Sequence, residues 1–361
     1  MYRIGHPYEL NLDPERVPAF YKTHWPKRTP LGSVEHYRYL FQQGGEGNPE
    51  ATIVVLDDKD KVLGAMAARR RPFLLANGKQ LMGAEMSTWL VHPEYQALGI
   101  GPKILQAFKD RFDVLLGCSI TPAARDLYAR SGFVWRPALH RVIYSPNWML
   151  LACVMEGAKL CEKIRRGRES ERTKAGHALA QVQIMKAWPE AVQIDQFGHG
   201  FARTQQHYVW RYAQNPFFHY RFATMAAANG ANMLAVYRVE DVGDVKAVRV
   251  VDISIRSENT SDLPAFLEAL CQAEQASVVD FFCSHQRLIA AFSSAPWLRI
   301  PEERDLCDFP HLLSPPDVRP VTSYSFVFWL SPKHRLGFSE DALLITKQDC
   351  DIDRLGVLPN G

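Results

Sequence analysis

The sequence predicts an α/β protein with mixed sheets, organised as two domains. Its 361 residues exceed what one ordinary hydrophobic core accommodates. Hydrophobic residues make up 47% and charged residues 22%, which is a globular composition. Apolar strand-like segments alternate with helix-like segments, and the same order of elements occurs in both halves of the chain. We therefore expect two copies of one α/β unit that retain little sequence identity to each other.

The first half begins with strand signals and continues as alternating strands and helices. The turn sequence DDKD separates two apolar segments, a pattern that predicts a hairpin. Thr121 is suited to cap a short helix at its start, and Gly132 is suited to end it. In order, we expect strands at 51–56, 61–70 and 81–91, a helix at 101–112, a strand at 113–120, a helix at 121–132 and a strand at 133–145.

A charged segment separates the two halves. Residues 160–178 are rich in helix formers and in both charges, which predicts a connector that is partly helical. We place the first domain at 1–150, the connector at 151–181 and the second domain at 182–361. In the second domain we expect a helix at 199–216, strands at 221–228, 233–239 and 247–255, a helix at 261–275, a strand at 277–284, a helix at 285–295 and a strand at 324–331.

Composition argues against several classes of protein. The net charge of +3 is too small to indicate, by itself, a nucleic-acid or membrane partner. The chain has no run of about 18 apolar residues, as a transmembrane helix requires, and its first residues lack the apolar core of a signal peptide. The seven cysteines are scattered and form no CxxC pair, so we expect reduced thiols in a cytoplasmic protein and no metal site.

One short segment, HPEYQALGIG at 92–101, lies between a predicted strand and a predicted helix. The start of a helix presents unpaired N–H groups and a partial positive charge, so it can hold a phosphate. Gly99 and Gly101 lack the side chains that would keep a phosphate from these amides. The dinucleotide fingerprint fits badly because Ile104 stands where it needs a small residue, and the P-loop fits badly because Pro102 interrupts its Gly-Lys-Ser/Thr sequence.

A third phosphate-binding pattern matches. Gln96-Ala97-Leu98-Gly99-Ile100-Gly101 fits Gln/Arg-x-x-Gly-x-Gly/Ala and resembles the coenzyme A pyrophosphate loop of the GNAT N-acetyltransferases. The segment DLYARSGF at 126–133 resembles the Tyr-x-x-x-Gly-Phe segment that closes the family's domain. The resemblance covers residues 51–144. A tight turn whose glycines serve packing alone is the alternative to this interpretation.

The resemblance implies acetyl-CoA or another acyl-CoA as co-substrate, with no metal. In this family the acyl thioester lies in a splay between two parallel strands, here the strand that ends at Val91 and the strand at 113–120. Backbone groups of Leu90 and Val91 would pair with the pantetheine arm, and the amides of 98–101 would hold the pyrophosphate. The implied coenzyme-binding residues are Leu90, Val91, Gln96, Ala97, Leu98, Gly99, Ile100, Gly101 and Lys103.

The resemblance also implies two catalytic tasks, because an acceptor amine attacks the thioester directly. Tyr128 occupies the family position of the acid that protonates the leaving thiolate, although it could instead pack its helix on the sheet. Glu85, within the apolar strand MGAEMSTWLV, is our candidate base, and pairing with a nearby arginine is its structural alternative. His92 at the strand end is a rival base, with a structural role as its own alternative. A base that acts through water is a further alternative.

The second half lacks the coenzyme loop. At the corresponding junction it reads VVDISIRSENTSDLPAFL, where Glu258 and Asp262 would repel a pyrophosphate. We therefore expect this domain to bind no coenzyme A and to supply a wall of the acceptor pocket. The aromatic segment 207–220 could hold a sugar or nucleotide, or it could pack in the core with Trp210 buried. In the first half, we expect the basic run 69–71 at a solvated strand edge.

The overall plan resembles tandem GNAT enzymes of bacteria. One intact half, one degenerate half and the acidic tail QDCDIDR at 348–354 are similar to enzymes that acylate nucleotide-linked amino sugars, and mycothiol-synthase-like enzymes share the architecture. A calcium loop in this tail is excluded because Arg354 stands where an EF-hand needs glycine. We expect an acyl-CoA-dependent N-acyltransferase of a small amine, for which a nucleotide-linked amino sugar is the favoured acceptor. The alternatives are protein or peptide N-acetylation and a non-catalytic acyl-CoA-binding sensor.

Overall fold

The structure is a computed structural model of the whole chain. It describes residues 2–25, 30–44, 50–147, 181–189, 192, 194–226, 232–242, 245–293, 296–300, 324–349 and 353. The predicted connector at 151–181 lies outside the described residues, except for its last residue.

The chain divides into two compact units. The first unit comprises residues 1–137, 325–338 and 349–361, and the second comprises 138–324 and 339–348. The domain boundaries expected at 150 and 182 differ from this division, because segments near the C-terminus belong to the first unit.

The first unit contains a mixed sheet with the strand order β1-β2-β3-β4-β5-β15-β6. Neighbouring strands are antiparallel except β4 and β5, which run parallel. β2 and β3 form the predicted hairpin, and β4 occupies the segment in which a third strand was expected. The strands are β1 (Arg3–Gly5), β2 (Ile53–Leu56), β3 (Val62–Leu74), β4 (Gln80–Val91), β5 (Val114–Cys118), β6 (Val134–Arg136) and β15 (Phe326–Leu330).

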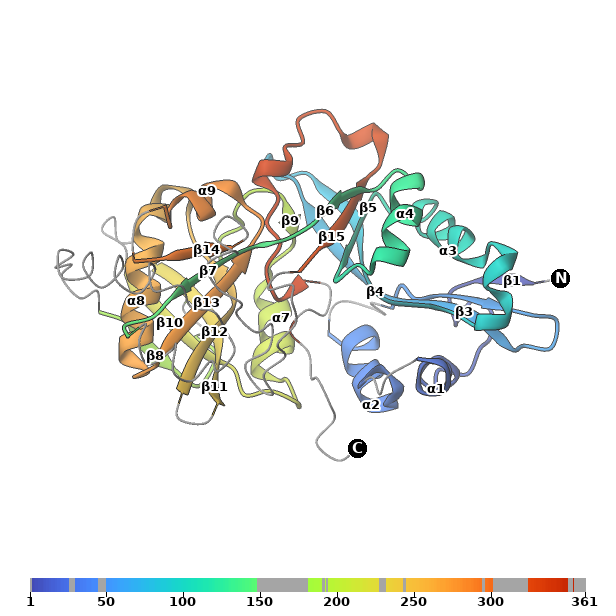
Figure 1. The fold of residues 1–361 in the computed structure, drawn as a ribbon, viewed down its shortest axis with the longest axis horizontal. Coiled ribbons are helices and arrows are strands. Elements are labelled where there is room, and N and C mark those ends of the chain that lie inside the picture. Colours follow the sequence, from blue (N-terminus) through green and yellow to red (C-terminus); the bar gives the residue numbers. More distant parts are fainter. Residues whose placement is uncertain are drawn as a thin grey trace. The chain divides into compact units, whose positions relative to one another are not determined.

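Helices cover both faces of this sheet, with α3 and α4 on one side and α1 and α2 on the other (Figure 1). Ile104 and Phe108 of α3 are buried in the core of the unit. Thr121 caps α4 as predicted, since its Oγ1 accepts a hydrogen bond from the Ala124 N–H, and Gly132 follows with a positive φ. The helices are α1 (Arg16–His24), η1 (Pro30–Gly32), α2 (Val34–Tyr37), the π-helix η2 (Arg38–Gln42), η3 (Pro93–Leu98), α3 (Ile100–Lys109), α4 (Pro122–Arg130) and η7 (Pro332–His334).

The second unit contains a mixed sheet with the strand order β14-β7-β13-β12-β11-β10-β8, in which β12 and β13 run parallel. The helix expected at 199–216 is confined to α7 and the π-helical turn η4. The strands of this sheet are β7 (His140–Tyr144), β8 (Gln183–Met185), β10 (Arg221–Ala226), β11 (Asn232–Val242), β12 (Val245–Ser254), β13 (Val278–Cys283) and β14 (Leu298–Ile300). The short strand β9 (Gly200–Phe201) also belongs to the second unit but not to this sheet. The helices are α7 (Gln205–Tyr208), η4 (Val209–Ala213), η5 (Ser257–Asp262), α8 (Leu263–Ala273), α9 (Gln286–Ala290) and η8 (Glu340–Ala342).

The structure corrects two strand predictions. The single strand expected at 133–145 is two strands, of which β6 belongs to the first sheet and β7 to the second. Pro137 lies between them and lacks the N–H that a continuous ladder needs. The strand expected at 324–331 to close the second domain is β15, which lies between β5 and β6 in the first sheet.

A buried ion cluster lies in the second unit. Asp280 on β13 accepts hydrogen bonds from Arg141 Nη2 at 2.7 Å and from Lys347 Nζ at 2.9 Å. Burial alone would raise the pKa of the Asp280 carboxyl, but the positive charges of Lys347, Arg141 and Arg249 outweigh it and hold that pKa below its ordinary value. Arg141 and Lys347 are buried and bond to this carboxylate, so its removal leaves their positive charge in the interior without this partner.

We expect Asp280→Asn to lower the free energy of unfolding by about 3–5 kcal/mol, because Arg141 and Lys347 lose their counter-charge. Urea unfolding at neutral pH measures this loss. The control is Asp126→Asn in the exposed pair with Arg125, which we expect to cost no more than about 1 kcal/mol.

The same pair of variants tests the pH dependence. A carboxylate whose pKa is depressed in the folded state contributes its stability above its unfolded pKa, near 3.9, and loses it as the pH falls further. The difference in the free energy of unfolding between Asp280→Asn and the wild type should therefore become smaller in acid. Equal losses in Asp280→Asn and Asp126→Asn at neutral pH would contradict this role of Asp280.

Candidate active site

The parallel strands β4 and β5 stop pairing before β4 ends (Figure 1). Their register runs from Gly83 opposite Val114 to Met86 opposite Gly117. β4 continues to Val91, still paired with β3 on its other side, and the described residues contain no later pair between β4 and β5. The edge of β4 that faces β5 is therefore open over its last residues. This is the geometry that a splay between the two strands requires.

A β-bulge lies where this edge opens. In the antiparallel pairing of β3 with β4, Met66 lies opposite Trp89, whereas Ala68 lies opposite Met86. One residue of β3 therefore faces two residues of β4. A bulge bends its strand and increases the local twist, so it changes the direction of the end of β4.

A tight turn joins β4 to α3. It passes through η3 to Gly99, whose φ of 67° lies in the left-handed region, and α3 begins at the next residue. Only glycine adopts this backbone conformation without strain, and a Cβ at Gly99 would meet no atom within 4 Å. The first N–H groups of a helix have no acceptor within the helix. The start of α3 therefore offers amide donors, and the positive end of the helix dipole, beside open space.

Packing against Trp89 gives a reason, other than phosphate binding, for glycine at position 101. A Cβ on Gly101 would lie 2.8 Å from Cζ2 of Trp89, which is too close for two carbon atoms. Its missing side chain therefore makes room for the Trp89 ring, so packing explains this glycine without any phosphate. The backbone N–H of Gly101 still lies in the first turn of α3 and stays a candidate donor.

The other predicted coenzyme-binding residues gather around the same turn. Leu90 and Val91 are half-buried at the end of β4, whereas Gln96, Ala97 and Leu98 are exposed in η3. The Gln96 side chain folds back onto the strand, because its Nε2 donates to the Val91 carbonyl at 3.4 Å. Gln96 thus closes the turn at the end of β4.

Two lysines lie near the turn, each with its ammonium group over an aromatic ring. Nζ of Lys103 in α3 lies 4.4 Å from the centroid of the Tyr2 ring. Nζ of Lys61 lies 5.1 Å from the centroid of the Tyr95 ring in η3. Sequence reasoning missed Lys61, since it belongs to the β2–β3 turn and no local motif connects it with η3.

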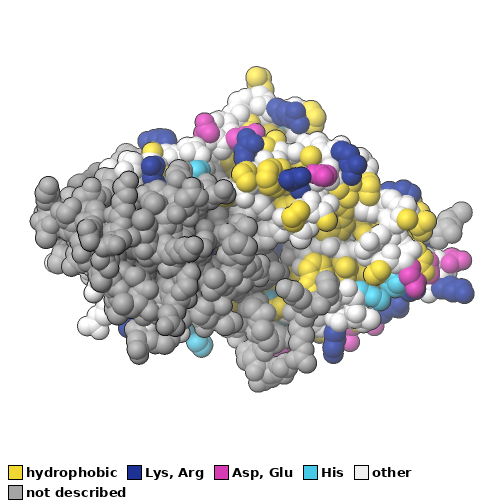
Figure 2. Space-filling view, in the orientation of Figure 1, with side chains coloured by type: hydrophobic (Ala, Val, Ile, Leu, Met, Phe, Trp, Pro, Cys, Tyr) yellow, Lys and Arg dark blue, Asp and Glu magenta, His cyan; other side chains and the backbone are white. Residues whose placement is uncertain are grey.

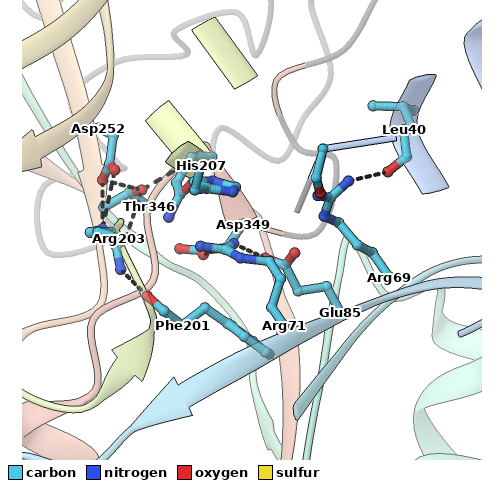
Figure 3. Close-up of polar contacts among 12 residues, drawn as sticks. Leu40, Arg69, Arg71, Glu85, Phe201, Arg203, His207, Asp252, Thr346 and Asp349 are labelled. Atoms are coloured by element: carbon cyan, nitrogen blue, oxygen red, sulfur yellow. Dashed lines mark hydrogen bonds and ion pairs between the residues drawn. The ribbon is translucent and has the colours of Figure 1, made fainter. Parts of the chain in front are cut away.

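Glu85 is buried on β4 and paired with an arginine. The Glu85 side chain is 7% exposed, and its Oε1 accepts a hydrogen bond from Arg71 Nη1 at 2.6 Å. The same Arg71 nitrogen lies 3.5 Å from Oδ1 of Asp349, so one guanidinium lies between two carboxylates (Figure 3). The arginine pairing considered as the alternative for Glu85 is therefore present. Its Oε2 makes no hydrogen bond within the described part of the chain.

The prediction that the basic run 69–71 lies at a solvated strand edge is wrong. Arg69 and Arg71 are buried, because alternate residues of β3 face the interior of the first unit. The Arg69 guanidinium donates to the carbonyls of Leu40 and Gln43 at 2.9 and 2.8 Å, which ties η2 and the residue after it to the sheet (Figure 3).

Two buried carboxylates of this region were missed from the sequence. Asp349 comes from the acidic tail, where sequence reasoning assigned it no individual role. The backbone of Glu50 forms an isolated antiparallel β-bridge with that of Arg69, and the Glu50 carboxylate accepts hydrogen bonds from Tyr37 and Gln42. Burial raises the pKa of the Glu50 carboxyl, although these hydrogen bonds oppose the shift. No local pattern marks either residue, since both depend on contacts between distant segments.

Tyr128 lies on α4 and is 3% exposed. Its ring makes edge contacts with Trp89 at 5.3 Å and with Phe133 at 5.0 Å between ring centroids. Tyr128 therefore packs its helix on the sheet, beside the open end of β4. Packing and a proton-donating role are compatible at this place, because Trp89 belongs to the open edge.

His92 has a structural contact at the strand end. Its Nδ1 accepts a hydrogen bond from the Glu94 N–H at 3.3 Å and so caps η3. Its ring centroid lies 4.4 Å from that of His24 and 5.2 Å from that of Tyr95. Burial lowers the pKa of His24, and the neighbouring His92 adds to this. The cap gives His92 a role that needs no proton transfer.

The second unit repeats the strand layout, and a segment of its own chain bonds to both parallel strands. Pairing of β12 with β13 ends at Val250 opposite Phe281, while β12 continues to Ser254. Thr346 Oγ1 donates to Asp252 on β12 at 2.9 Å (Figure 3). The following residue, Lys347, is bonded to Asp280 on β13. These two side chains thus link both strands.

The described residues offer little support for other kinds of site. Among them, no group of three His, Cys, Asp or Glu side chains is arranged to hold a metal ion. None of the helices in the described ranges is both long and apolar enough to cross a membrane. On the described part of the face in Figure 2, Lys and Arg side chains are scattered among hydrophobic and acidic ones instead of forming one basic patch.

Part of the first unit matches a known family. Residues 17–133 match the acetyltransferase (GNAT) family. The matched segment includes β4, the turn, α3 and α4, and it ends at Phe133, the last residue of the segment DLYARSGF. It covers about a third of the chain. None of the curated proteins matches the chain.

Two solved structures align with most of the chain. A GCN5-related N-acetyltransferase from Anabaena variabilis is 10% identical, with 91% of this chain and 73% of that chain covered and a TM-score of 0.50. Saccharomyces cerevisiae N-myristoyltransferase with bound myristoyl-CoA is 12% identical, with coverages of 91% and 82% and a TM-score of 0.46. The first of these confirms the predicted fold class of mixed α/β sheets in two GNAT-like domains.

The contact of Gly101 with Trp89 is testable by a double-mutant cycle. We expect Gly101→Ala to destabilise the protein by about 1–3 kcal/mol, because the added methyl group overpacks the site, although alanine otherwise favours a helix. In a Trp89→Phe background, which removes the contacting Cζ2 atom, the same substitution should cost much less. Urea unfolding gives all four free energies. The same cost in both backgrounds would show that Trp89 does not require this glycine.

Proposed function

We propose that the protein is an acyl-CoA-dependent N-acyltransferase that acts on the amine of a small molecule. The observation that carries the proposal is the open edge of β4, which leads through the left-handed Gly99 into the first turn of α3. An extended pantetheine arm needs a free strand edge, and a pyrophosphate needs amide donors at a helix start. The first unit brings these two features together at one place, within a segment that matches an acetyltransferase family.

The co-substrate is acetyl-CoA or another acyl-CoA. Its pyrophosphate binds the amides around Gly99, and its pantetheine arm lies along the β4 edge at Leu90 and Val91. Lys103 and Lys61 lie near the turn and supply positive charge for the phosphates. The thioester then lies near the bulge, close to where the pairing of β4 with β5 ends.

The reaction needs one proton acceptor and one proton donor. The acceptor amine, once deprotonated, attacks the thioester carbonyl carbon and forms a C–N bond, after which the C–S bond breaks and coenzyme A leaves as a thiolate. The Tyr128 hydroxyl donates a proton to that sulfur, from its place beside Trp89 on the open edge. As the amide forms, its nitrogen loses the second proton, which restores the tyrosine hydroxyl. The products are an amide and the free thiol of coenzyme A.

Glu85 takes the proton from the acceptor ammonium. Arg71 holds Oε1 of Glu85 and leaves Oε2 to accept a proton. The ion pair with Arg71 fixes the orientation of the carboxylate on β4. The cap that His92 forms on η3 makes this histidine the weaker candidate for the base.

The acceptor is a small amine, and a nucleotide-linked amino sugar is the first acceptor to test. This choice rests on the resemblance of the tandem arrangement and the acidic tail to such enzymes. The aromatic segment 207–220 does not support it, because Trp210, Tyr208 and Tyr212 are buried and pack within the second unit. Sugar recognition by stacking on these rings is therefore not part of the proposal.

Glu85→Gln and Tyr128→Phe test the catalytic roles. Glutamine keeps an oxygen for Arg71 but is not a base, so we expect turnover to fall by about 100-fold or more while acetyl-CoA binding is retained. Tyr128→Phe keeps the ring contacts and removes the acid, so turnover should fall by about tenfold or more. Release of the coenzyme A thiol with a panel of amines and amino sugars measures turnover, and calorimetry measures binding.

The matched controls are Glu94→Gln in η3 and Tyr95→Phe, both of which should keep wild-type turnover. The profile of turnover against pH gives a second readout, since loss of a base removes the acidic limb of the profile, whereas a folding defect lowers turnover at every pH. Full turnover in both Glu85→Gln and Tyr128→Phe would refute the assigned roles.

A further inference from the structure

A side chain from α1 lies in the bulge between β3 and β4. The Tyr21 hydroxyl donates to the Thr88 carbonyl at 2.7 Å and accepts from the Ala67 N–H at 2.9 Å. These two backbone groups come from opposite sides of the bulge, one on β4 and one on β3. Tyr21 itself is 0% exposed. One hydroxyl thus replaces the direct hydrogen bond that a regular ladder would make.

A buried bulge needs such a replacement. An extra residue in one strand leaves backbone N–H and C=O groups without ladder partners, and unpaired groups are costly in the interior. Burial raises the pKa of the Tyr21 hydroxyl above its ordinary value, so the hydroxyl keeps the proton that it donates to Thr88. The bulge and the tyrosine are therefore complementary.

The position of the bulge determines what the end of β4 presents. Side chains of a strand alternate between two faces, so a one-residue shift in register exchanges the faces of every residue that follows. Trp89 follows the bulge directly, and it contacts both Gly101 in α3 and Tyr128 in α4. Leu90 and Val91 come next on the open edge. A shift at the bulge would disturb all of these contacts together.

We propose that Tyr21 is a positioning residue of the acyl-CoA site, which fixes the bulge and thereby the orientation of Trp89, Leu90 and Val91 on the open edge of β4. This inference rests on the proposed function, because the edge matters only if it binds the co-substrate. Tyr21 reaches the site from a helix far from the coenzyme loop in sequence. Nothing in its local pattern distinguishes it from an ordinary buried tyrosine.

The second unit provides a matched control. Tyr208 on α7 is also 0% exposed and also uses its hydroxyl, which donates to Oδ2 of Asp252 at 2.7 Å. Its partner is a side-chain carboxylate instead of the backbone of a bulge. Tyr208→Phe therefore removes a buried tyrosine hydroxyl, as Tyr21→Phe does, without touching β4.

The test compares Tyr21→Phe with Tyr208→Phe in the full chain. Calorimetry gives the Kd for acetyl-CoA, and steady-state kinetics give separate KM values for acetyl-CoA and for the amine. We expect Tyr21→Phe to raise the Kd and the KM for acetyl-CoA about tenfold, as the loss of well-placed hydrogen bonds implies, with the KM for the amine unchanged. Tyr208→Phe should keep the wild-type Kd for acetyl-CoA even if it lowers the urea midpoint equally.

Four other outcomes are informative. Wild-type affinity in a folded Tyr21→Phe variant would overturn the positioning role, and so would equal weakening in both variants, which would indicate a general loss of stability. If the wild type itself binds no acetyl-CoA, the proposed function fails, and this role fails with it. If Tyr21→Phe does not fold, a ring-fluorinated tyrosine at position 21 keeps the shape and weakens the hydroxyl as an acceptor. An unchanged Kd with the fluorinated residue would then overturn the proposal.

Discussion

The early end of the pairing between β4 and β5 is the constraint on which the candidate site depends. Parallel strands normally satisfy each other's backbone groups along their whole length, so an unpaired edge must be imposed by something else. Here the last pair is Met86 with Gly117, and a bulge against β3 follows at once. The left-handed Gly99 then turns the chain into α3. Strand edge, turn and helix start are thus consecutive parts of one segment, and each is useful for coenzyme binding only beside the others.

The second unit has the same strand layout with different contacts. Its parallel pair also ends before β12 does, and Thr346 and Lys347 bond to side chains of β12 and β13. A segment of the protein's own chain therefore bonds to both parallel strands of this unit. Two similar sheets can thus differ in chemistry. The first unit has an open strand edge and a glycine turn, whereas in the second unit the parallel strands carry side chains that form internal ion pairs and hydrogen bonds.

Sequence reasoning succeeded where the signal is local. The hairpin of β2 with β3, the strand β4 and the cap of Thr121 on α4 all follow from neighbouring residues. It failed where partners are distant in the chain. The insertion of β15 between β5 and β6, the pairing of Arg71 with Glu85 and the bond from Thr346 to Asp252 carry no local mark. Gly101 was singled out as a coenzyme-binding residue, but a contact with Trp89 that only the folded chain reveals already explains why it lacks a side chain.

The most direct test of the account is native mass spectrometry of the protein titrated with acetyl-CoA, beside a Gly99→Trp variant. A Cβ at Gly99 meets open space, so the new side chain would cover the amide donors without displacing a neighbour, although the positive φ adds some strain. The account predicts one acetyl-CoA per wild-type chain and none on the folded variant. Two acetyl-CoA molecules per wild-type chain would contradict the expectation that the second unit binds no coenzyme A. No acetyl-CoA on the wild type would contradict the coenzyme site itself.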